Sequence, residues 1–150
     1  MRQSTAAVAL IRRQQRGQTV WLAQWNPGWQ RYHFVAGHKR PNETFRECAE
    51  REIGEELDLQ KGSDFTVDEE PLAHLEYTAW SEGAKAETNY TAELFQVELN
   101  GYAAWERVEA NSANRWLSKE EIRSGHCGDG APVSETMRFF LSKVEGMDPC

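Results

Sequence analysis

The residues most able to do chemistry are three glutamates, Glu52, Glu55 and Glu56, in an acidic stretch of the chain. Thr44 with a glutamate three residues later forms a capping-box pattern, so we expect a helix over Thr44–Leu57. Each residue of a helix turns by about 100° around its axis. The three glutamates then share one side of the helix with apolar neighbours, which are Phe45, Cys48 and Ala49.

A helix side that combines apolar residues with three carboxylates differs from an ordinary solvated face. Like charges at i,i+3 and i,i+4 cost about 0.2–0.5 kcal/mol per pair, and carboxylates that are partly buried without partners cost more. A hard divalent cation removes this conflict, because Mg²⁺ prefers carboxylate oxygens together with waters and phosphates. The residues alone leave two interpretations open, which are a metal site and a helix end that extends past the core into water.

The segment from Gly37 to Leu59 closely resembles the Nudix box, GX5EX7REUXEEXGU, in which U is a bulky apolar residue. Eight of the nine defined positions match at the required spacing, namely Gly37, Glu43, Arg51, Glu52, Ile53, Glu55, Glu56 and Leu59. The ninth position, a glycine in the box, is Asp58 here, and Asp tolerates a left-handed conformation better than most residues. Ala36 replaces the first glycine of the Gly-Gly pair that commonly opens the box, and it keeps the backbone carbonyl.

The resemblance to the Nudix family implies both a fold and a reaction. The fold is of the α/β class, an α/β/α sandwich with a central mixed β-sheet and the Nudix-box loop-helix-loop, as a single domain over residues 1–150. The reaction is the hydrolysis of a pyrophosphate bond in a nucleoside diphosphate linked to another group, X, by water that a metal activates. The implied cofactor is Mg²⁺ or Mn²⁺.

The resemblance also assigns roles to individual residues of the box. Glu52, Glu55 and Glu56 would bind the metal and carry the catalysis, with the main-chain carbonyl of Ala36 as a further ligand. Arg51 would orient one of these glutamates, and its i,i+4 relation to Glu55 makes that geometrically reasonable.

Two further box residues and several glutamates outside the box complete the expected site. Gly37 and Glu43 would support the box loop. The alternative role of Glu43 is to bind a second metal. The proton of the attacking water would go to a box glutamate or to a glutamate from a loop outside the box. The candidates outside the box are Glu109, expected in the loop before residues 115–117, and then Glu82 and Glu87, expected in the loop after Trp80.

Basic residues gather just before the predicted helix in an otherwise acidic chain. One interpretation is contact with substrate phosphates beside the metal, and the other is ordinary surface charge. Aromatic residues in the same region would either stack on a base or pack under the first strands. The residues in question are the basic Arg31, His38, Lys39 and Arg40 and the aromatic Trp29 and Tyr32.

Hydrophobic patterns outside the box predict the elements that position it. Alternating or continuous apolar runs predict strands at Ala6–Arg12, Thr19–Trp25, Trp29–Ala36, Leu72–Trp80 and Thr88–Leu99. A second capping box begins at Ser118 and predicts a short helix. A glycine-rich loop, Gly125–Gly130, and an amphipathic helix over Val133–Val144 follow.

Composition narrows the class of protein and its partners. A net charge of −7 argues against an extended nucleic-acid partner, because such binding depends on Lys and Arg, but it allows a small nucleotide substrate. Three cysteines without a CxxC pair argue against a disulfide framework and favour a reducing, cytoplasmic location. No apolar run reaches membrane-spanning length, so we expect no membrane partner. The oligomeric state is left open, with a homodimer as one alternative.

The resemblance to the Nudix family leaves three functions to compare. The first is a Nudix pyrophosphohydrolase, and the alternative is a non-catalytic Nudix-fold nucleotide-binding or regulatory module. Such modules usually lose box glutamates, which are all present here. A third is an isomerase of the same fold that acts on isopentenyl diphosphate, but the cysteine and His-rich metal site that it needs is not seen. The substrate is not named by the box, which is shared by enzymes acting on oxidised nucleotides, ADP-ribose, dinucleoside polyphosphates, nucleotide sugars and mRNA caps.

Overall fold

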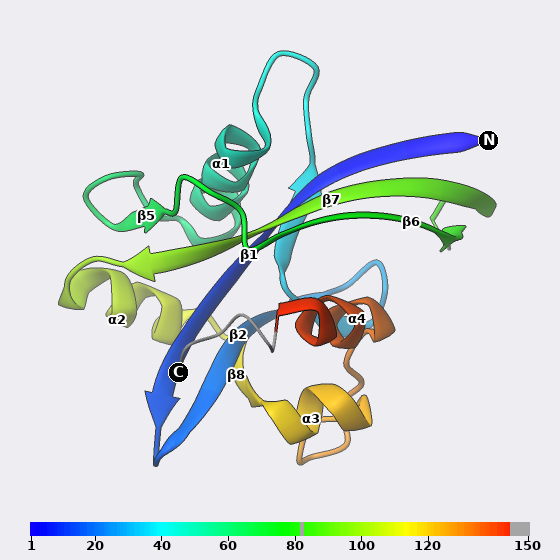
Figure 1. Ribbon diagram of the computed structural model, residues 1–150. Coiled ribbons are helices and arrows are strands. Elements are labelled where there is room, and N and C mark those ends of the chain that lie inside the picture. The colour runs from blue at the N-terminus through cyan, green and yellow to red at the C-terminus, as the bar shows by residue number, and fades with distance from the viewer. Residues whose placement is uncertain (82, 145–150) are drawn as a thin grey trace.

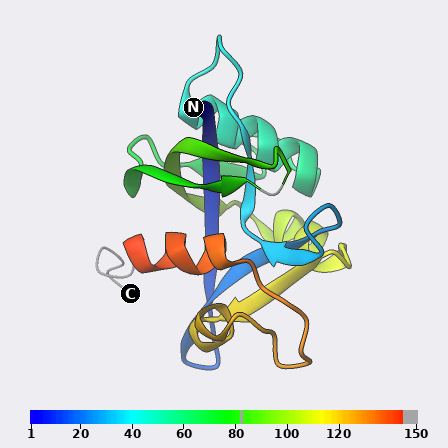
Figure 2. The same cartoon turned by 90° about the vertical axis from the view of Figure 1, so that its right-hand side faces the viewer.

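The computed structural model describes residues 1–81 and 83–144, and these form three layers (Figure 1). Helices α1 (Phe45–Leu57) and α2 (Tyr102–Ala110) pack on one face of an eight-stranded sheet. Helices α3 (Lys119–Ser124) and α4 (Glu135–Val144) pack on the other face. Figure 2 shows α1 and α4 on opposite sides of the strands. The predicted α/β/α sandwich is confirmed.

Strand β1 (Arg2–Gln15) lies in the middle of the sheet and is buried on both faces. Ala7 and Ile11 belong to the core under α1, while Val8 belongs to the core under α4. A strand that is covered on both faces reads as a continuous apolar run, which is what the sequence shows. β1 runs parallel to β7 (Ala86–Leu99) and antiparallel to β2 and β4, so the sheet is mixed, as predicted.

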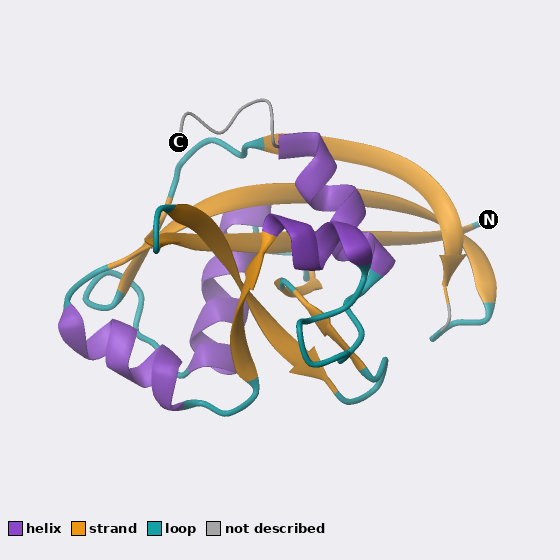
Figure 3. Cartoon of the chain, turned by 90° about the horizontal axis from the view of Figure 1, so that it is seen from below, coloured by secondary structure: helices purple, strands orange, loops and turns teal. Residues whose placement is uncertain are grey.

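The other strands extend the sheet to both sides of the β1–β7 pair, which runs through the molecule in Figure 3. The order is β3-β2-β1-β7-β5, with β4 paired to β1, β6 paired to β7 and β8 paired to β2. Their bounds are β2 Gln18–Asn26, β3 Arg31–His33, β4 Val35–His38, β5 Phe65–Val67, β6 Ala73–Ser81 and β8 Asn114–Ser118.

Some sequence predictions need correction. The single strand predicted over residues 29–36 is wrong, because a turn with Gln30 at φ 57° precedes two short strands, β3 and β4, that pair with different neighbours. β5 and α2 were not predicted. β5 has only three residues, and α2 begins after Gly101 without a side-chain cap, so neither carries a local signal. α4 begins at Glu135, two residues after its predicted start.

Helix α1 forms as the sequence predicts. Thr44 Oγ1 accepts a hydrogen bond from the Glu47 amide at 3.0 Å, and Glu47 Oε1 accepts one from the Thr44 amide at 2.8 Å. The helix ends at Asp58, whose φ of 55° is the left-handed conformation expected where the box usually has glycine. Both ends of the helix that carries the glutamates are therefore fixed by local sequence.

Two further predictions concern cysteines and membranes. Cys48 and Cys127 are buried free thiols, and Cys150 lies outside the described residues. Within residues 1–81 and 83–144, no helix is long and apolar enough to cross a membrane.

Candidate active site and metal centre

Arg51 is the centre of the hydrogen-bond network in the box. Its Nε and Nη2 donate to the two carboxylate oxygens of Glu43 at 3.1 and 2.7 Å. Its Nη1 donates to Glu52 Oε1 at 2.9 Å, and Nη2 also reaches the main-chain oxygen of His38 at 3.0 Å. The guanidinium lowers the pKa of Glu43 to about 2. Arg51 thus fixes the loop before the helix and one of the expected metal ligands together.

Gly37 makes room for Glu52. It lies in β4 opposite Ala7 of β1, and a Cβ added at Gly37 would overlap the carboxylate and Cγ of Glu52. The Glu52 side chain is only 15% exposed. The box therefore needs a glycine here because of a close approach between the strand backbone and a functional carboxylate.

Glu56 carries the most unusual carboxylate of the molecule. Its Oε2 is buried and has no hydrogen-bond partner among residues 1–81 and 83–144. Burial, followed by the charge of Glu52, raises the pKa of Glu56 to about 7, although a backbone hydrogen bond from Ala36 lowers it. Buried polar atoms normally find partners, and an exception points to a missing water or ion or to a catalytic role.

Glu55 lies differently from the other two glutamates. Its side chain is 56% exposed, and its Oε1 is 3.5 Å from Arg51 Nη1. The prediction that all three glutamates lie on the inner side of the helix is therefore wrong for Glu55, which sits at the solvent edge. The i,i+4 contact exists, but Arg51 makes a shorter bond to Glu52.

The donor atoms of the box are of the kind that binds a hard divalent cation. Over the described ranges, no three His, Cys, Asp or Glu side chains already converge on one point. The donors still fit a hard cation, because Glu56 offers an unpaired buried oxygen close to the Glu52 charge. Mg²⁺ usually takes one or two carboxylates together with waters and substrate phosphates, and it needs no complete protein cage.

Two of the glutamates expected in loops outside the box, Glu109 and Glu87, lie in regular elements instead. Glu109 lies in α2, where its carboxylate accepts from Trp116 Nε1 at 2.8 Å and pairs with Arg13 at 2.6 Å. Glu87 lies in β7, and Glu82 lies outside the described residues. The loop placement of Glu109 fails because the unpredicted helix α2 occupies that segment.

The basic residues predicted as one cluster are divided between two places. Arg31 pairs with Asn26 at the start of β3, whereas His38 pairs with Ala6 at the end of β4. Only the second group, which consists of His38, Lys39 and Arg40, lies within the box loop.

The predicted basic and aromatic substrate contacts lie mostly against other side chains of the protein. His38 Nδ1 lies 3.3 Å from Ser4 Oγ, and Lys39 Nζ lies 5.7 Å from the centre of the Phe45 ring. The Tyr32 ring packs edge-on against Trp25 at 5.1 Å. Trp29 is 44% exposed, so it stays the most accessible of the predicted aromatic contacts.

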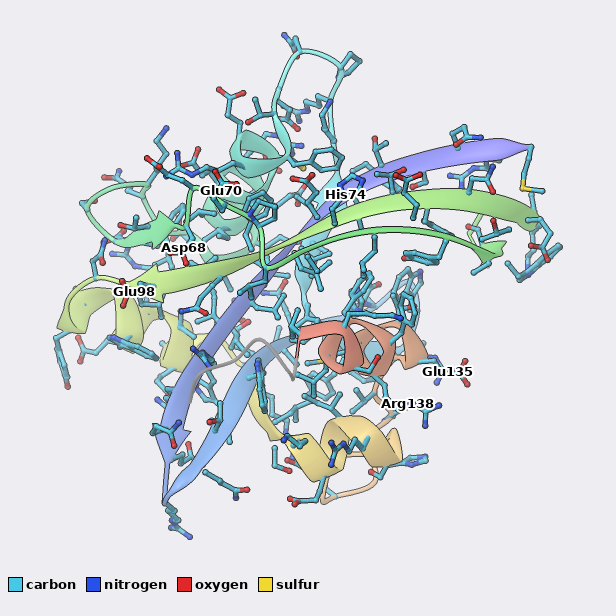
Figure 4. The ribbon with its side chains drawn as sticks, in the orientation of Figure 1. Asp68, Glu70, His74, Glu98, Glu135 and Arg138 are labelled. Carbon is cyan, nitrogen blue, oxygen red and sulfur yellow. The ribbon has the colours of Figure 1, made fainter. Side chains whose placement is uncertain are left out.

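Among the described residues, the charged side chains outside the box do not form a group that could hold a metal ion. Figure 4 labels six of them at separate places, Asp68, Glu70 and Glu98 beside β5 and β7, His74 on β6, and Glu135 and Arg138 on α4. All six are exposed. None of them shows the burial without a partner that marks Glu56.

One residue beside Glu56 is not marked by any sequence pattern. Gln24 on β2 donates from Nε2 to the main-chain oxygen of Glu56 at 3.2 Å. A single amide within a strand carries no motif. The only sign is its register opposite Asn114 on β8, which requires the sheet to be known.

The fold, the Arg51 network and the glutamate helix together define the class of protein. The NUDIX domain family matches residues 1–137, and this chain belongs to the Nudix family. The enzyme class expected from the box, a pyrophosphohydrolase, is confirmed, and the family generally uses divalent metal ions.

Solved structures share the fold with this chain. An Ap4A hydrolase of C. elegans is 21% identical, with a TM-score of 0.66 over 98% of both chains. A Nudix hydrolase of M. Smegmatis, RenU, is 16% identical, with a TM-score of 0.60 over 97% of this chain and 88% of that one. The NUDIX domain of Shewanella oneidensis NrtR, complexed with ADP ribose, is 8% identical, with a TM-score of 0.61 over 98% and 89%. No curated protein matches the chain.

Proposed function

We propose that this enzyme hydrolyses a pyrophosphate bond in a nucleoside diphosphate linked to another group, with Mg²⁺ or Mn²⁺ as the cofactor. Glu52, Glu55 and Glu56 would hold the ion, with the Ala36 carbonyl as a further ligand. The observation that supports this most is the buried Oε2 of Glu56, which has no partner within the described ranges. The bound ion would neutralise charge on the phosphate oxygens and acidify a water molecule.

Other residues of the box position the ligands, and one of them would accept a proton. Arg51 keeps Glu52 and Glu43 in place through its guanidinium. Gly37 leaves the space that the Glu52 carboxylate occupies. The Glu56 carboxylate is also our candidate to accept the proton of the attacking water, through the oxygen that does not bind the ion.

A nucleotide is the substrate class that the surroundings favour. His38 is the last residue of β4, and Lys39 and Arg40 follow it within the box loop, where cationic groups would contact phosphate oxygens. Two of the similar structures are named for Ap4A and ADP ribose, so we take both compounds as first candidates. The net charge of −7 disfavours an extended nucleic acid. We keep the homodimer as a prediction, to be checked by light scattering.

The test is hydrolysis of a panel that includes Ap4A, ADP-ribose and oxidised nucleoside triphosphates, in Mg²⁺ and in Mn²⁺. We expect product release by the wild type, none after chelation, and a loss of about 100-fold or more in Glu56→Gln. The identity of the products shows which phosphorus is attacked.

The matched control for this test is Glu50→Gln. It removes the same charge from the same helix, but Glu50 pairs with Lys61 at 3.5 Å and stands outside the proposed site. Its rate should stay near that of the wild type. A wild type that binds ADP-ribose but hydrolyses nothing in the panel would instead be a non-catalytic nucleotide-binding module.

A further inference from the structure

Gln24 joins the helix of the glutamates to the sheet at the turn that carries Glu56. Its Nε2 donates to the main-chain oxygen of Glu56 at 3.2 Å and to Asn114 Oδ1 at 2.9 Å. The last four carbonyls of a helix have no partner within the helix. Glu56 lies within the last four residues of α1, so Gln24 satisfies a carbonyl that the helix itself leaves open.

Asn114 holds Gln24 in this orientation. The two residues are directly opposite each other in the β2–β8 pair. Asn114 Nδ2 donates to the main-chain oxygen of Val108, in the last turn of α2, at 3.0 Å. Because each side-chain amide nitrogen has an acceptor, neither amide can turn over without losing a bond. Gln24 and Asn114 thus connect α1, β2, β8 and α2 at one point.

This connection matters because little else fixes the Glu56 side chain. Within the described part of the chain, one carboxylate oxygen is buried without a partner, and the group is stabilised in its charged form by a hydrogen bond from the Ala36 backbone. Arg51, which holds Glu52, makes no bond to Glu56 among the described residues. The place of the Glu56 carboxylate is therefore set mainly by where the helix backbone lies.

We propose that Gln24 is a positioning residue for Glu56, acting through the main-chain oxygen to hold the carboxylate where it binds the divalent cation. This rests on the proposed metal-binding role of Glu56. Groups that orient metal ligands from outside are worth about 10- to 100-fold in metal affinity or activity. Gln24 acts through the backbone, so we place its effect near the lower end.

The experiment compares Gln24→Met with the wild type. Mn²⁺ binding is measured without substrate by electron paramagnetic resonance, and turnover is measured separately with the best substrate of the panel. We expect about tenfold weaker Mn²⁺ binding and about tenfold lower kcat, with KM little changed. Asn114→Ala should shift both quantities in the same direction by less, because Gln24 keeps its bond to Glu56.

Arg46→Met is the matched control for a loss of helix attachment. Arg46 ties the other end of α1 to the sheet, since its Nε and Nη2 donate to the main-chain oxygen of Val67 at 3.1 and 2.8 Å. Removing it should lower the unfolding temperature and leave Mn²⁺ binding and kcat near wild type. A purely structural role of Gln24 predicts that the two variants behave alike.

The proposal is overturned if Gln24→Met binds Mn²⁺ and turns over like the wild type, or if Arg46→Met causes the same losses. If Gln24→Met does not fold, Gln24→Asn takes its place, because that amide is one methylene too short to reach Glu56. Glu56→Gln separates the two claims. If it keeps Mn²⁺ binding and turnover, the proposed function fails, whereas if it loses both and the Gln24 variants lose neither, only the positioning role fails.

Discussion

Two glutamates of the same box, Glu43 and Glu56, have opposite environments. Glu43 accepts two hydrogen bonds from Arg51 and one from the Arg40 amide, and its pKa is lowered to about 2. Glu56 leaves one buried oxygen without a partner, and its pKa is raised to about 7. The paired carboxylate holds the loop, whereas the unpaired one fits the proposed role as a ligand of a cation.

The difference has an energetic meaning. Leaving a buried polar group without a partner costs about 1–3 kcal/mol, and more when the group is charged. Most buried polar groups are paired, so a buried carboxylate without a partner is a candidate for a functional role. The contrast between a paired and an unpaired carboxylate therefore separates architecture from active site within one motif.

Gly37→Ala should have the largest effect, because it displaces Glu52, the carboxylate whose charge acts on the unpaired Glu56. The added methyl group would take the space of the Glu52 carboxylate, which lies at the free end of a flexible side chain. We expect the fold to survive and turnover to fall by about 100- to 1000-fold, because the ligand is displaced. Gly83→Ala is the control, since a Cβ there meets nothing within 4 Å. A Gly37→Ala enzyme with normal kcat would contradict the close approach.

Arg51→Met should remove the hydrogen bonds that pair Glu43. It removes the bonds to Glu43, Glu52 and the His38 carbonyl at once. We expect turnover to fall by about 10- to 100-fold together with a lower unfolding temperature, measured by circular dichroism. Arg46→Met removes a guanidinium from the same helix without touching the network. Equal kinetic losses in both variants would mean that Arg51 only attaches the helix.

His33 tests whether burial and a shifted pKa alone mark a functional group. It is buried, its Nδ1 lies 2.7 Å from Ser134 Oγ, and burial lowers its pKa from 6.5 to about 4. The unfolded chain then takes up a proton at a higher pH than the folded one, so this stabilisation is complete above pH 6.5 and is lost as the pH falls toward 4.

The expected size of the His33 effect is about 2 kcal/mol of unfolding free energy between pH 7 and pH 5. Urea unfolding at both values measures it as the difference between wild type and His33→Gln. His126→Gln, at an exposed position, should keep the wild-type pH dependence. If His33→Gln keeps it as well, the neutral buried state of His33 is wrong. Turnover of folded His33→Gln should be near normal.

Asp129→Asn should have the smallest effect. Asp129 pairs with Arg115 through two bonds of 3.2 and 3.0 Å, but both groups are near the surface. Exposed ion pairs contribute about 0–1 kcal/mol, so unfolding free energy and kcat should change little. A large loss of activity would show that the loop after α3 takes part in the site.

The sequence predicts the box far better than its surroundings, and the reason is physical. Thr44 and Asp58 bound α1 through local interactions, so the helix and the order of its glutamates can be read directly. The prediction that Glu55 lies on the inner side fails, because a helical wheel ignores how far a long side chain near the helix end reaches into solvent. The pairing of Arg51 with Glu43 depends on the fold of the loop.

The sequence alone does not predict the contacts between segments that are distant along the chain. Gln24, Asn114 and Glu56 are joined only by the register of β2 with β8 and by the packing of α1. The sequence does not predict α2, because no side chain caps the helix. The predicted loop position of Glu109 is wrong for the same reason. Local signals predict elements, whereas the surroundings of a site depend on contacts between those elements.

The most direct test of the central claim is the unfolding free energy of wild type and Glu56→Gln, each with and without Mg²⁺. If Glu56 is an unpaired buried carboxylate kept for a cation, the variant should be at least as stable as the wild type without metal. Mg²⁺ should stabilise the wild type, by about 2.7 kcal/mol at 100 times its dissociation constant, and should hardly stabilise the variant. Equal stabilisation of both proteins by Mg²⁺, or a variant that is less stable without it, would contradict the account.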